Sequence, residues 1–150
     1  MNSEYLHNII KDLTEVAWEE HGRGIRNRTT LVGVEYFEEK YGGKLEGKGV
    51  EETIEAAIDL LKEEGLIADA DYNRDNQVLK VDFKSCGHLQ TEKDLMERGV
   101  IGVINCPCSN VLMHFIGKSL GKYCELAGVE VKDTICSVTI VLMRESDQEE

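Results

Sequence analysis

The stretch Asn105-Cys106-Pro107-Cys108-Ser109-Asn110 lies between the apolar run Val100–Ile104 and a second apolar run that begins at Val111. It contains two cysteines and the single proline of the chain. Proline lacks a backbone N–H and has a fixed φ, so it suits the first position of a helix. The sequence therefore predicts a change from strand to helix here. Both thiols would lie near the positive end of the helix dipole, which favours thiolate.

On both sides of this stretch, apolar residues recur at helical spacing. The first such segment carries one stripe, formed by Leu6, Ile9/Ile10, Leu13 and Val16/Ala17. The helix that follows Pro107 is expected to bury a broad face that includes Tyr123, Cys124 and Ala127. Gly128 is expected to end it. The expected helices are Ser3–Glu20, Leu31–Tyr41, Val50–Glu64 and Val111–Ala127, with a further short helix possible within Gln90–Gly99.

Between the third helix and the proline the apolar period changes from about 3.6 to 2. Two strands, Leu66–Tyr72 and Val78–Ser85, are separated by Asn73–Asn76, which is typical of a hairpin turn. Extended structure is also expected at Val100–Asn105, and Val129–Met143 should supply one long strand or two short ones. The order of elements predicts an α+β fold, a small antiparallel sheet with helices packed mainly on one face. Three alternate residues are assigned to its core face: Leu79, Val81 and Phe83.

The composition fits one soluble domain, because 150 residues with 41% hydrophobic and 31% charged side chains can bury a core. Within it we expect an N-terminal helix and basic loop (1–28), a binding core (29–143) and an acidic tail (144–150). The net charge of −12 predicts no nucleic-acid or membrane-surface partner. A start without a signal peptide predicts a cytoplasmic location. The role of three clustered arginines stays open: Arg23, Arg26 and Arg28.

Five cysteines in a chain without an export signal favour metal binding or thiol chemistry over a disulfide framework. The candidate metal ligands all fall at expected element boundaries: Cys86, His88, Cys106, Cys108 and Cys136. Zinc is the expected metal and an iron–sulfur cluster the weaker alternative. The plain alternative is that these thiols are small buried core residues. The remaining histidines, and Cys124 on its apolar helix face, are expected to have no ligand role.

Several segments together resemble the vinyl-4-reductase-type, or hydrocarbon-binding, domain family. They are a helix ending at Gly65, a strand ending in Lys80-Val-Asp-Phe-Lys-Ser-Cys86, Cys106 before a helix with Phe115-Ile-Gly117, and Val129-Glu-Val-Lys-Asp-Thr-Ile-Cys136. The resemblance covers residues 30–142. It implies a ligand-binding fold related to Golgi transport-complex subunits, usually dimeric, that binds small hydrophobic or aromatic molecules. It also implies that Cys86, Cys106 and Cys136 can bind zinc.

The family usually has a further cysteine after the last strand cysteine, but here Ser137–Leu142 contains none. Cys108 is the candidate that replaces it as a fourth ligand. The sequence thus predicts a non-enzymatic small-molecule-binding protein, a sensor or accessory subunit and a homodimer, with a zinc site beside an apolar pocket. The alternative is a thiol oxidoreductase or thiol-dependent enzyme that uses Cys106 and Cys108. A third alternative is a purely structural interaction subunit with an interface at Gly117 and Gly121.

Overall fold

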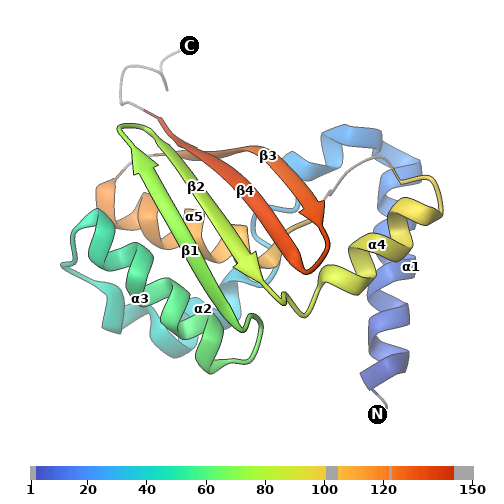
Figure 1. Ribbon diagram of the computed structural model, residues 1–150, viewed down its shortest axis with the longest axis horizontal. Coiled ribbons are helices and arrows are strands. Elements are labelled where there is room, and N and C mark those ends of the chain that lie inside the picture. The colour runs from blue at the N-terminus through green and yellow to red at the C-terminus, as the bar shows by residue number, and fades with distance from the viewer. Residues whose placement is uncertain (1–2, 101–104, 122, 144–150) are drawn as a thin grey trace.

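The computed structural model describes residues 3–100, 105–121 and 123–143. Its elements follow one another in the order helices, hairpin, helices, hairpin (Figure 1). The helices are α1 (Ser3–His21), η1 (Gly22–Asn27), α2 (Val34–Tyr41), η2 (Gly42–Leu45), α3 (Val50–Glu63), α4 (Leu89–Glu97) and α5 (Pro107–Leu120). The strands are β1 (Asp69–Asp75), β2 (Val78–Lys84), β3 (Cys124–Lys132) and β4 (Ile135–Leu142).

The four strands form one antiparallel sheet in the order β1-β2-β4-β3. The two hairpins therefore meet at β2 and β4, where Leu79 lies opposite Ile140 and Phe83 opposite Cys136. In β2, Leu79, Val81 and Phe83 are buried and their neighbours in sequence are not, which confirms the predicted core face.

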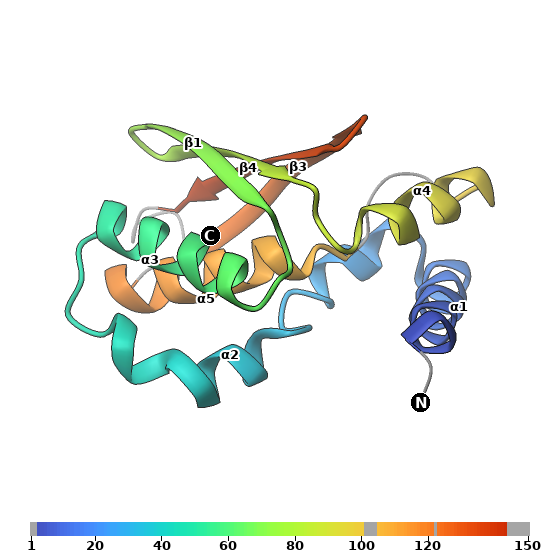
Figure 2. The ribbon, with the colours of Figure 1, turned by 60° about the horizontal axis from the view of Figure 1, so that its bottom comes forward.

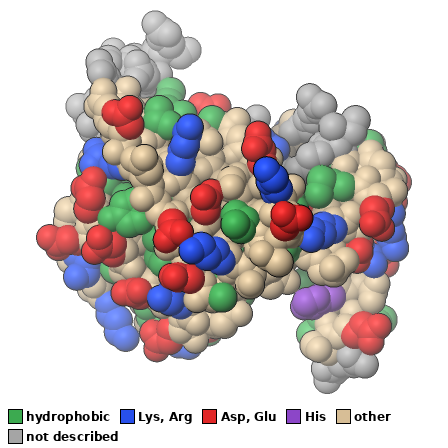
Figure 3. Space-filling view, in the orientation of Figure 1, with side chains coloured by type: hydrophobic (Ala, Val, Ile, Leu, Met, Phe, Trp, Pro, Cys, Tyr) green, Lys and Arg blue, Asp and Glu red, His purple; other side chains and the backbone are tan. Residues whose placement is uncertain are grey.

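Helices α3 and α5 cover one face of the sheet, and α2 lies on their far side (Figure 2). The other face of the sheet carries acidic and basic side chains interspersed (Figure 3). They include the ion pair Lys84–Asp71, with 2.8 Å between its charged atoms. The buried core therefore lies between the sheet and α3 and α5. The predicted α+β class, with helices mainly on one face, is confirmed.

Two predicted boundaries are wrong, because the spacing of residues in the sequence did not show where the chain turns. The first hairpin turns at Asn76 and Gln77, not at Asn73–Asn76, and Asn76 takes a left-handed φ of 57°. The last long helix ends at Leu120, where Gly121 adopts a φ of 64° and caps it.

Tyr123, Cys124 and Ala127 consequently do not lie on α5. Cys124 begins β3, and Gly128 lies inside this strand, next to a register shift, and ends no helix. The C-terminal β-branched stretch supplies two strands, β3 and β4, and β3 begins earlier than expected. Because Gly121 is the helix cap, it does not form a close-packing helix face with Gly117.

Helix α1 lies beside α4, away from the sheet (Figures 1 and 2). Ala17 and Trp18 pack on a second small cluster made by Ile25, Leu95 and Val100, yet no residue of α1 is itself buried. The apolar stripe predicted on this helix exists, but most of it is exposed and does not join the core.

Some expectations fall on parts of the chain outside the described residues. These are the extended run at 101–104, the acidic tail at 144–150 and the side chain of Arg23. Arg28 is exposed. Among the helices of the described residues, none has the length and apolar character needed to cross a membrane.

A polar cluster joins the end of α2 to the end of α3. Glu64 accepts hydrogen bonds from the hydroxyl of Tyr41 and from Lys40 (2.6 Å) and Tyr36 (2.9 Å). The hydrogen bond from Lys40, followed by the one from Tyr41, lowers the pKa of Glu64 to about 2. A carboxylate with a depressed pKa stabilises the fold above its unfolded pKa, and this contribution is lost as pH falls.

We expect Glu64→Gln to lower the thermal midpoint at pH 6 but to have little effect near pH 2. In the wild type, the contribution of Glu64 disappears as pH falls from about 4.5 towards 2. Thermal unfolding followed by circular dichroism at several pH values measures this. The control is Glu63→Gln, at an exposed neighbouring position. If the two variants have equal midpoints at pH 6, the cluster does not stabilise the fold.

Candidate functional site, a buried group of four cysteines

Four of the five cysteines meet at the end of the core near α4. Cys86 lies two residues after the end of β2, and Cys136 is the second residue of β4. Cys106 is the N-cap of α5, and Cys108 lies in its first turn after Pro107. The predicted start of a helix at Pro107 is therefore correct. Cys106, Cys108 and Cys136 are buried, and Cys86 is partly exposed.

The thiols form two close pairs, each joining α5 to the sheet. The Sγ atoms of Cys86 and Cys108 are 3.9 Å apart. Cys106 and Cys136 form the second pair, in which Cys136 lowers the pKa of Cys106, and the Sγ of Cys106 lies 3.0 Å from the Oγ of Ser109, which donates to it. Cys106 and Cys108 thus pair with cysteines from other segments, although only one residue separates them.

Within each pair the hydrogen bond separates the two pKa values. The bond from Cys108 lowers the pKa of Cys86 to about 6 against the opposing effect of burial, and the backbone N–H of His88 adds to this lowering. The bond from Cys136 lowers the pKa of Cys106. The pKa values of Cys108 and Cys136 are raised, first by these bonds and then by burial. The thiolate form is therefore favoured at Cys86 and Cys106 and disfavoured at Cys108 and Cys136.

Tight backbone geometry positions Cys86. Ser85 adopts a left-handed φ of 53°, which turns the chain out of β2. Its N–H donates to the carbonyl of Thr134 at 2.9 Å, and the N–H of Gly87 donates to the carbonyl of Leu66 at 2.8 Å. These bonds fix the Cys86-Gly87-His88 turn between the sheet and the end of α3.

His88 lies beside the thiols and contacts a buried acid. Its Nε2 is 2.8 Å from Oε1 of Glu92, one turn further along α4. This contact does not have the geometry of a hydrogen bond. Within the described part of the chain, the Nε2 of His88 and both carboxylate oxygens of Glu92 have no hydrogen-bond partner. Burial lowers the pKa of His88, but Glu92, Cys86 and Cys106 outweigh it and raise the pKa overall.

The five predicted ligand residues therefore come together, but not as a finished metal site. Among the described residues, no group of three or more His, Cys, Asp or Glu side chains stands close enough to hold a metal ion. The Cys86–Cys108 pair does have a suitable spacing. Two sulfurs bound to one tetrahedral zinc, each about 2.3 Å from it, are about 3.8 Å apart. A four-sulfur site would require the second pair to approach the first.

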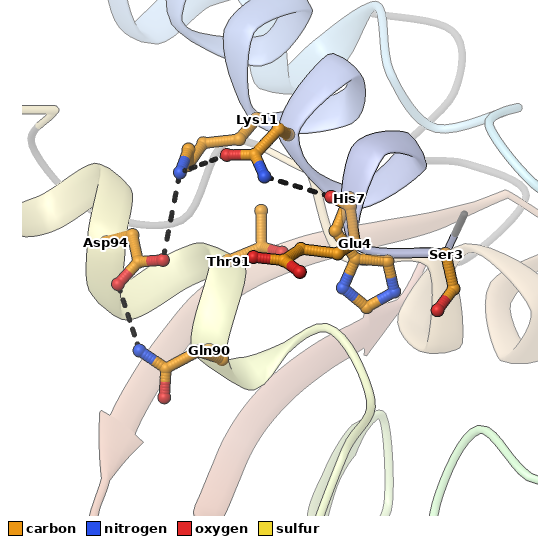
Figure 4. Close-up of a pocket in the computed structure, with 8 residues that line it drawn as sticks. Ser3, Glu4, His7, Lys11, Gln90, Thr91 and Asp94 are labelled. Carbon is orange, nitrogen blue, oxygen red and sulfur yellow. Dashed lines mark hydrogen bonds and ion pairs between the residues drawn. The ribbon is translucent and has the colours of Figure 1, made fainter. Parts of the chain in front are cut away.

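A cavity of about 300 Å³ opens directly onto Cys86 and Cys108. Its other walls are Leu66, Gly87, His88, Thr91 and Pro107, with His7 and Ile10 from α1. A more polar cavity of about 430 Å³ adjoins it under α1 and shares His7 and Thr91 (Figure 4). There Lys11 points towards Asp94, which accepts a hydrogen bond from Gln90 at 2.9 Å.

The other candidates lie elsewhere. Cys124 is in β3, where burial raises the pKa of its thiol to about 11. His114 lies on α5 with its Nε2 2.7 Å from Oε2 of Glu38. His21 ends α1 and is exposed. His7, expected to be a surface residue, is exposed but also lines both cavities under α1.

Sequence reasoning missed three residues of the site: Ser109, Asn110 and Glu92. Asn110 is buried, and its Nδ2 donates to the carbonyls of Thr29 (2.8 Å) and Val32 (3.1 Å), which fixes α5 against the turn before α2. Ser109 and Asn110 follow Cys108 directly, and polar side chains in the first turn of a helix often bond locally. Glu92 is four residues after His88, the spacing at which helical side chains meet.

Comparison with known proteins assigns the chain to no family. No protein-family model matches it, and no curated protein is similar enough to count as a relative. A solved structure described as "Probing the function of heme distortion in the H-NOX family" aligns with 85% of this chain and 66% of its own, at 11% identity and a TM-score of 0.42. A TM-score this low does not establish a common fold. The vinyl-4-reductase resemblance is not confirmed and stays an expectation.

Proposed function

We propose that the protein binds a small apolar molecule in the cavity beside Cys86 and Cys108, next to a zinc ion held by cysteine. The observation that carries this proposal is the convergence of four buried or half-buried thiols from three separate segments, two of which, Cys86 and Cys108, line a cavity. Thiols brought together from distant segments are more typical of a metal centre than of core packing alone.

The proposed ligands are Cys86, Cys106, Cys108 and Cys136. The resemblance implies three of them, and the 3.9 Å between the sulfurs of Cys86 and Cys108 supports the fourth. Zinc prefers thiolate, and two of the four thiols already have lowered pKa values. A zinc ion bound by four thiolates would link the sheet to α5 and would have a structural role.

His88 would then be a neighbour of the centre and not a ligand. The Nε2 of its ring is 2.8 Å from Oε1 of Glu92, so a carboxylate already engages this nitrogen. This assignment leaves the ring free to face the cavity that it lines.

The cavity sets the class of molecule that we propose. Its volume of about 300 Å³ is at the lower limit for small-molecule sites, and Ile10, Leu66 and Pro107 supply apolar walls. His7 and Thr91 supply polar groups on the side that this cavity shares with the neighbouring one. A small aromatic or branched aliphatic molecule with one polar group fits this lining.

Native mass spectrometry and metal analysis of protein purified without chelator test the proposal together. We expect about one zinc per chain and a retained small molecule. Added indole should shift the amide signals of Leu66, Gly87 and Thr91 in NMR spectra. Less than about a tenth of an equivalent of metal would overturn the zinc assignment. Indole shifts scattered away from this cavity would overturn the binding site.

The rival function is thiol chemistry, and one observation favours it. Cys86, with its pKa lowered to about 6, lines the cavity and is partly exposed. In this form the reactive pair is Cys86 with Cys108, since Cys106 and Cys108 have different partners. Rapid alkylation of Cys86 by iodoacetamide at pH 7 in protein that carries no metal as purified would favour the rival over the zinc site.

A further inference from the structure

The outer side of α1 carries an exposed apolar stripe. Five large apolar side chains of this helix are between 41% and 65% exposed: Tyr5, Leu6, Ile10, Leu13 and Val16. No residue of α1 is buried. An amphipathic helix normally turns its apolar stripe towards the protein core. Here the stripe faces away, so some other surface is expected to cover it.

The side of α1 that faces the molecule makes polar contacts, besides the packing of Ala17 and Trp18 on the small apolar cluster near α4. Lys11 reaches towards Asp94 of α4 (4.0 Å), and Arg98, just after α4, contacts Asp12 (3.4 Å) and Glu15 (2.8 Å) (Figure 4 shows the contact of Lys11). These polar contacts orient the helix, because turning the apolar stripe inward would break them. The exposure of the stripe is therefore a feature of how α1 is anchored.

We infer that the stripe is covered by α1 of a second copy of this chain, packed antiparallel to the first. Leu6, Ile9, Leu13 and Val16 repeat at alternating steps of three and four, the a and d spacing of a helix pair. In an antiparallel pair centred near Lys11, Leu6 meets Val16 of the second copy and Ile9 meets its Leu13. The stripe is thus self-complementary.

The distribution of charge favours the antiparallel arrangement. The C-terminal half of α1 contains four acidic residues and no lysine or arginine: Asp12, Glu15, Glu19 and Glu20. The N-terminal half carries one acid, Glu4, together with Lys11 and the positive end of the helix dipole. Antiparallel packing places each acidic half beside the less acidic half of the other copy. Parallel packing would place the acidic halves together.

Charge also argues against a lipid surface as the occupant. Helices that lie on membranes carry lysine and arginine on their polar face, whereas the only lysine or arginine of α1 is Lys11. Anionic lipid would be repelled by a chain of net charge −12.

The size of the contact sets the expected affinity. A helix of 19 residues is roughly 28 Å long. One pair of such helices buries an area near or below the lower limit of about 1,200 Å² for stable interfaces. The dimer should therefore dissociate in the micromolar range. Ile10 lies on the stripe and also lines the cavity at Cys86, so this contact would adjoin the proposed ligand site.

Sedimentation equilibrium of the full chain between about 1 and 200 µM tests the inference. We expect a reversible dimer for the wild type and at least about a tenfold larger dissociation constant for Leu13→Glu. Leu13 is 65% exposed, so this substitution should leave the fold intact, and Val16→Glu should act in the same way. The matched control is Leu31→Glu, at a leucine outside α1 that is 74% exposed.

Three results would overturn the inference. They are a wild type that stays monomeric at 200 µM, a dimer that Leu13→Glu and Val16→Glu leave unchanged, and a monomer that binds phosphatidylcholine vesicles through α1. Orientation is read from isotope-filtered methyl NOEs in a mixed-label dimer. Contacts between Leu6 of one copy and Val16 of the other support antiparallel packing. Contacts between Leu6 and Leu6 would contradict it.

Discussion

Cys108→Ser is expected to reduce bound zinc from about one equivalent to less than about a tenth of an equivalent. It should also lower the thermal midpoint by ten degrees or more. Cys108 contacts Cys86, so its loss removes one proposed ligand and leaves the neighbouring sulfur without its partner. The effect on stability follows because a bound metal stabilises only the folded chain. Metal analysis and thermal unfolding of protein purified in the same way measure both effects.

The matched control for Cys108→Ser is Cys124→Ser. Cys124 is partly buried, whereas Cys108 is buried, and it lies in β3 apart from the four-thiol group. The Cys124→Ser variant should keep its zinc and lose little stability. If both variants keep the metal, Cys108 is not a ligand. If both lose it, the metal is bound by accessible thiols in general and not by this site.

The response of the protein to a chelator separates the zinc site from the thiol-enzyme alternative. A structural zinc centre protects its sulfurs, so chelation should increase the alkylation rate of Cys86 and lower the thermal midpoint together. A catalytic thiol without metal would react rapidly before chelation and would be indifferent to it. The two functions therefore predict different effects of a chelator on Cys86, a faster alkylation for the zinc site and no change for the thiol enzyme.

The sequence was most informative where chemistry restricts the residue. Pro107 located the start of α5, and alternation in Val78–Ser85 identified the buried residues of β2. The positions of Cys86 and Cys136 at strand ends predicted that they would meet the thiols of α5. The first inference rests on the missing N–H of proline, the second on the two-residue period of a strand and the third on the topology of the sheet. The first two depend on neighbouring residues only, and the third depends on how the strands pair.

The errors arose where packing alone decides. Tyr123, Cys124 and Ala127 continue the helical spacing of α5, so only the left-handed turn at Gly121 separates them from it. The stripe on α1 is a true amphipathic pattern, but its direction depends on the polar anchors at Asp94 and Arg98, which lie far away in the sequence. Glu92 was missed because its spacing from His88 indicates only that the two side chains can meet, and not that this acid is buried.

Phe83→Ala is expected to cost about 3–5 kcal/mol of unfolding free energy, the range for removing a fully buried aromatic ring. Phe83 is completely buried and lies opposite Cys136 in the pairing of β2 with β4. The control is Val78→Ala in the same strand, where the side chain is 37% exposed and the cost should be below about 1 kcal/mol. Urea denaturation of chelator-treated protein measures both.

Because the ring supports the strand that carries Cys136, Phe83→Ala should also weaken zinc binding in untreated protein, whereas Val78→Ala should not. Equal losses of stability in the two variants would mean that the core does not lie on this face of the sheet.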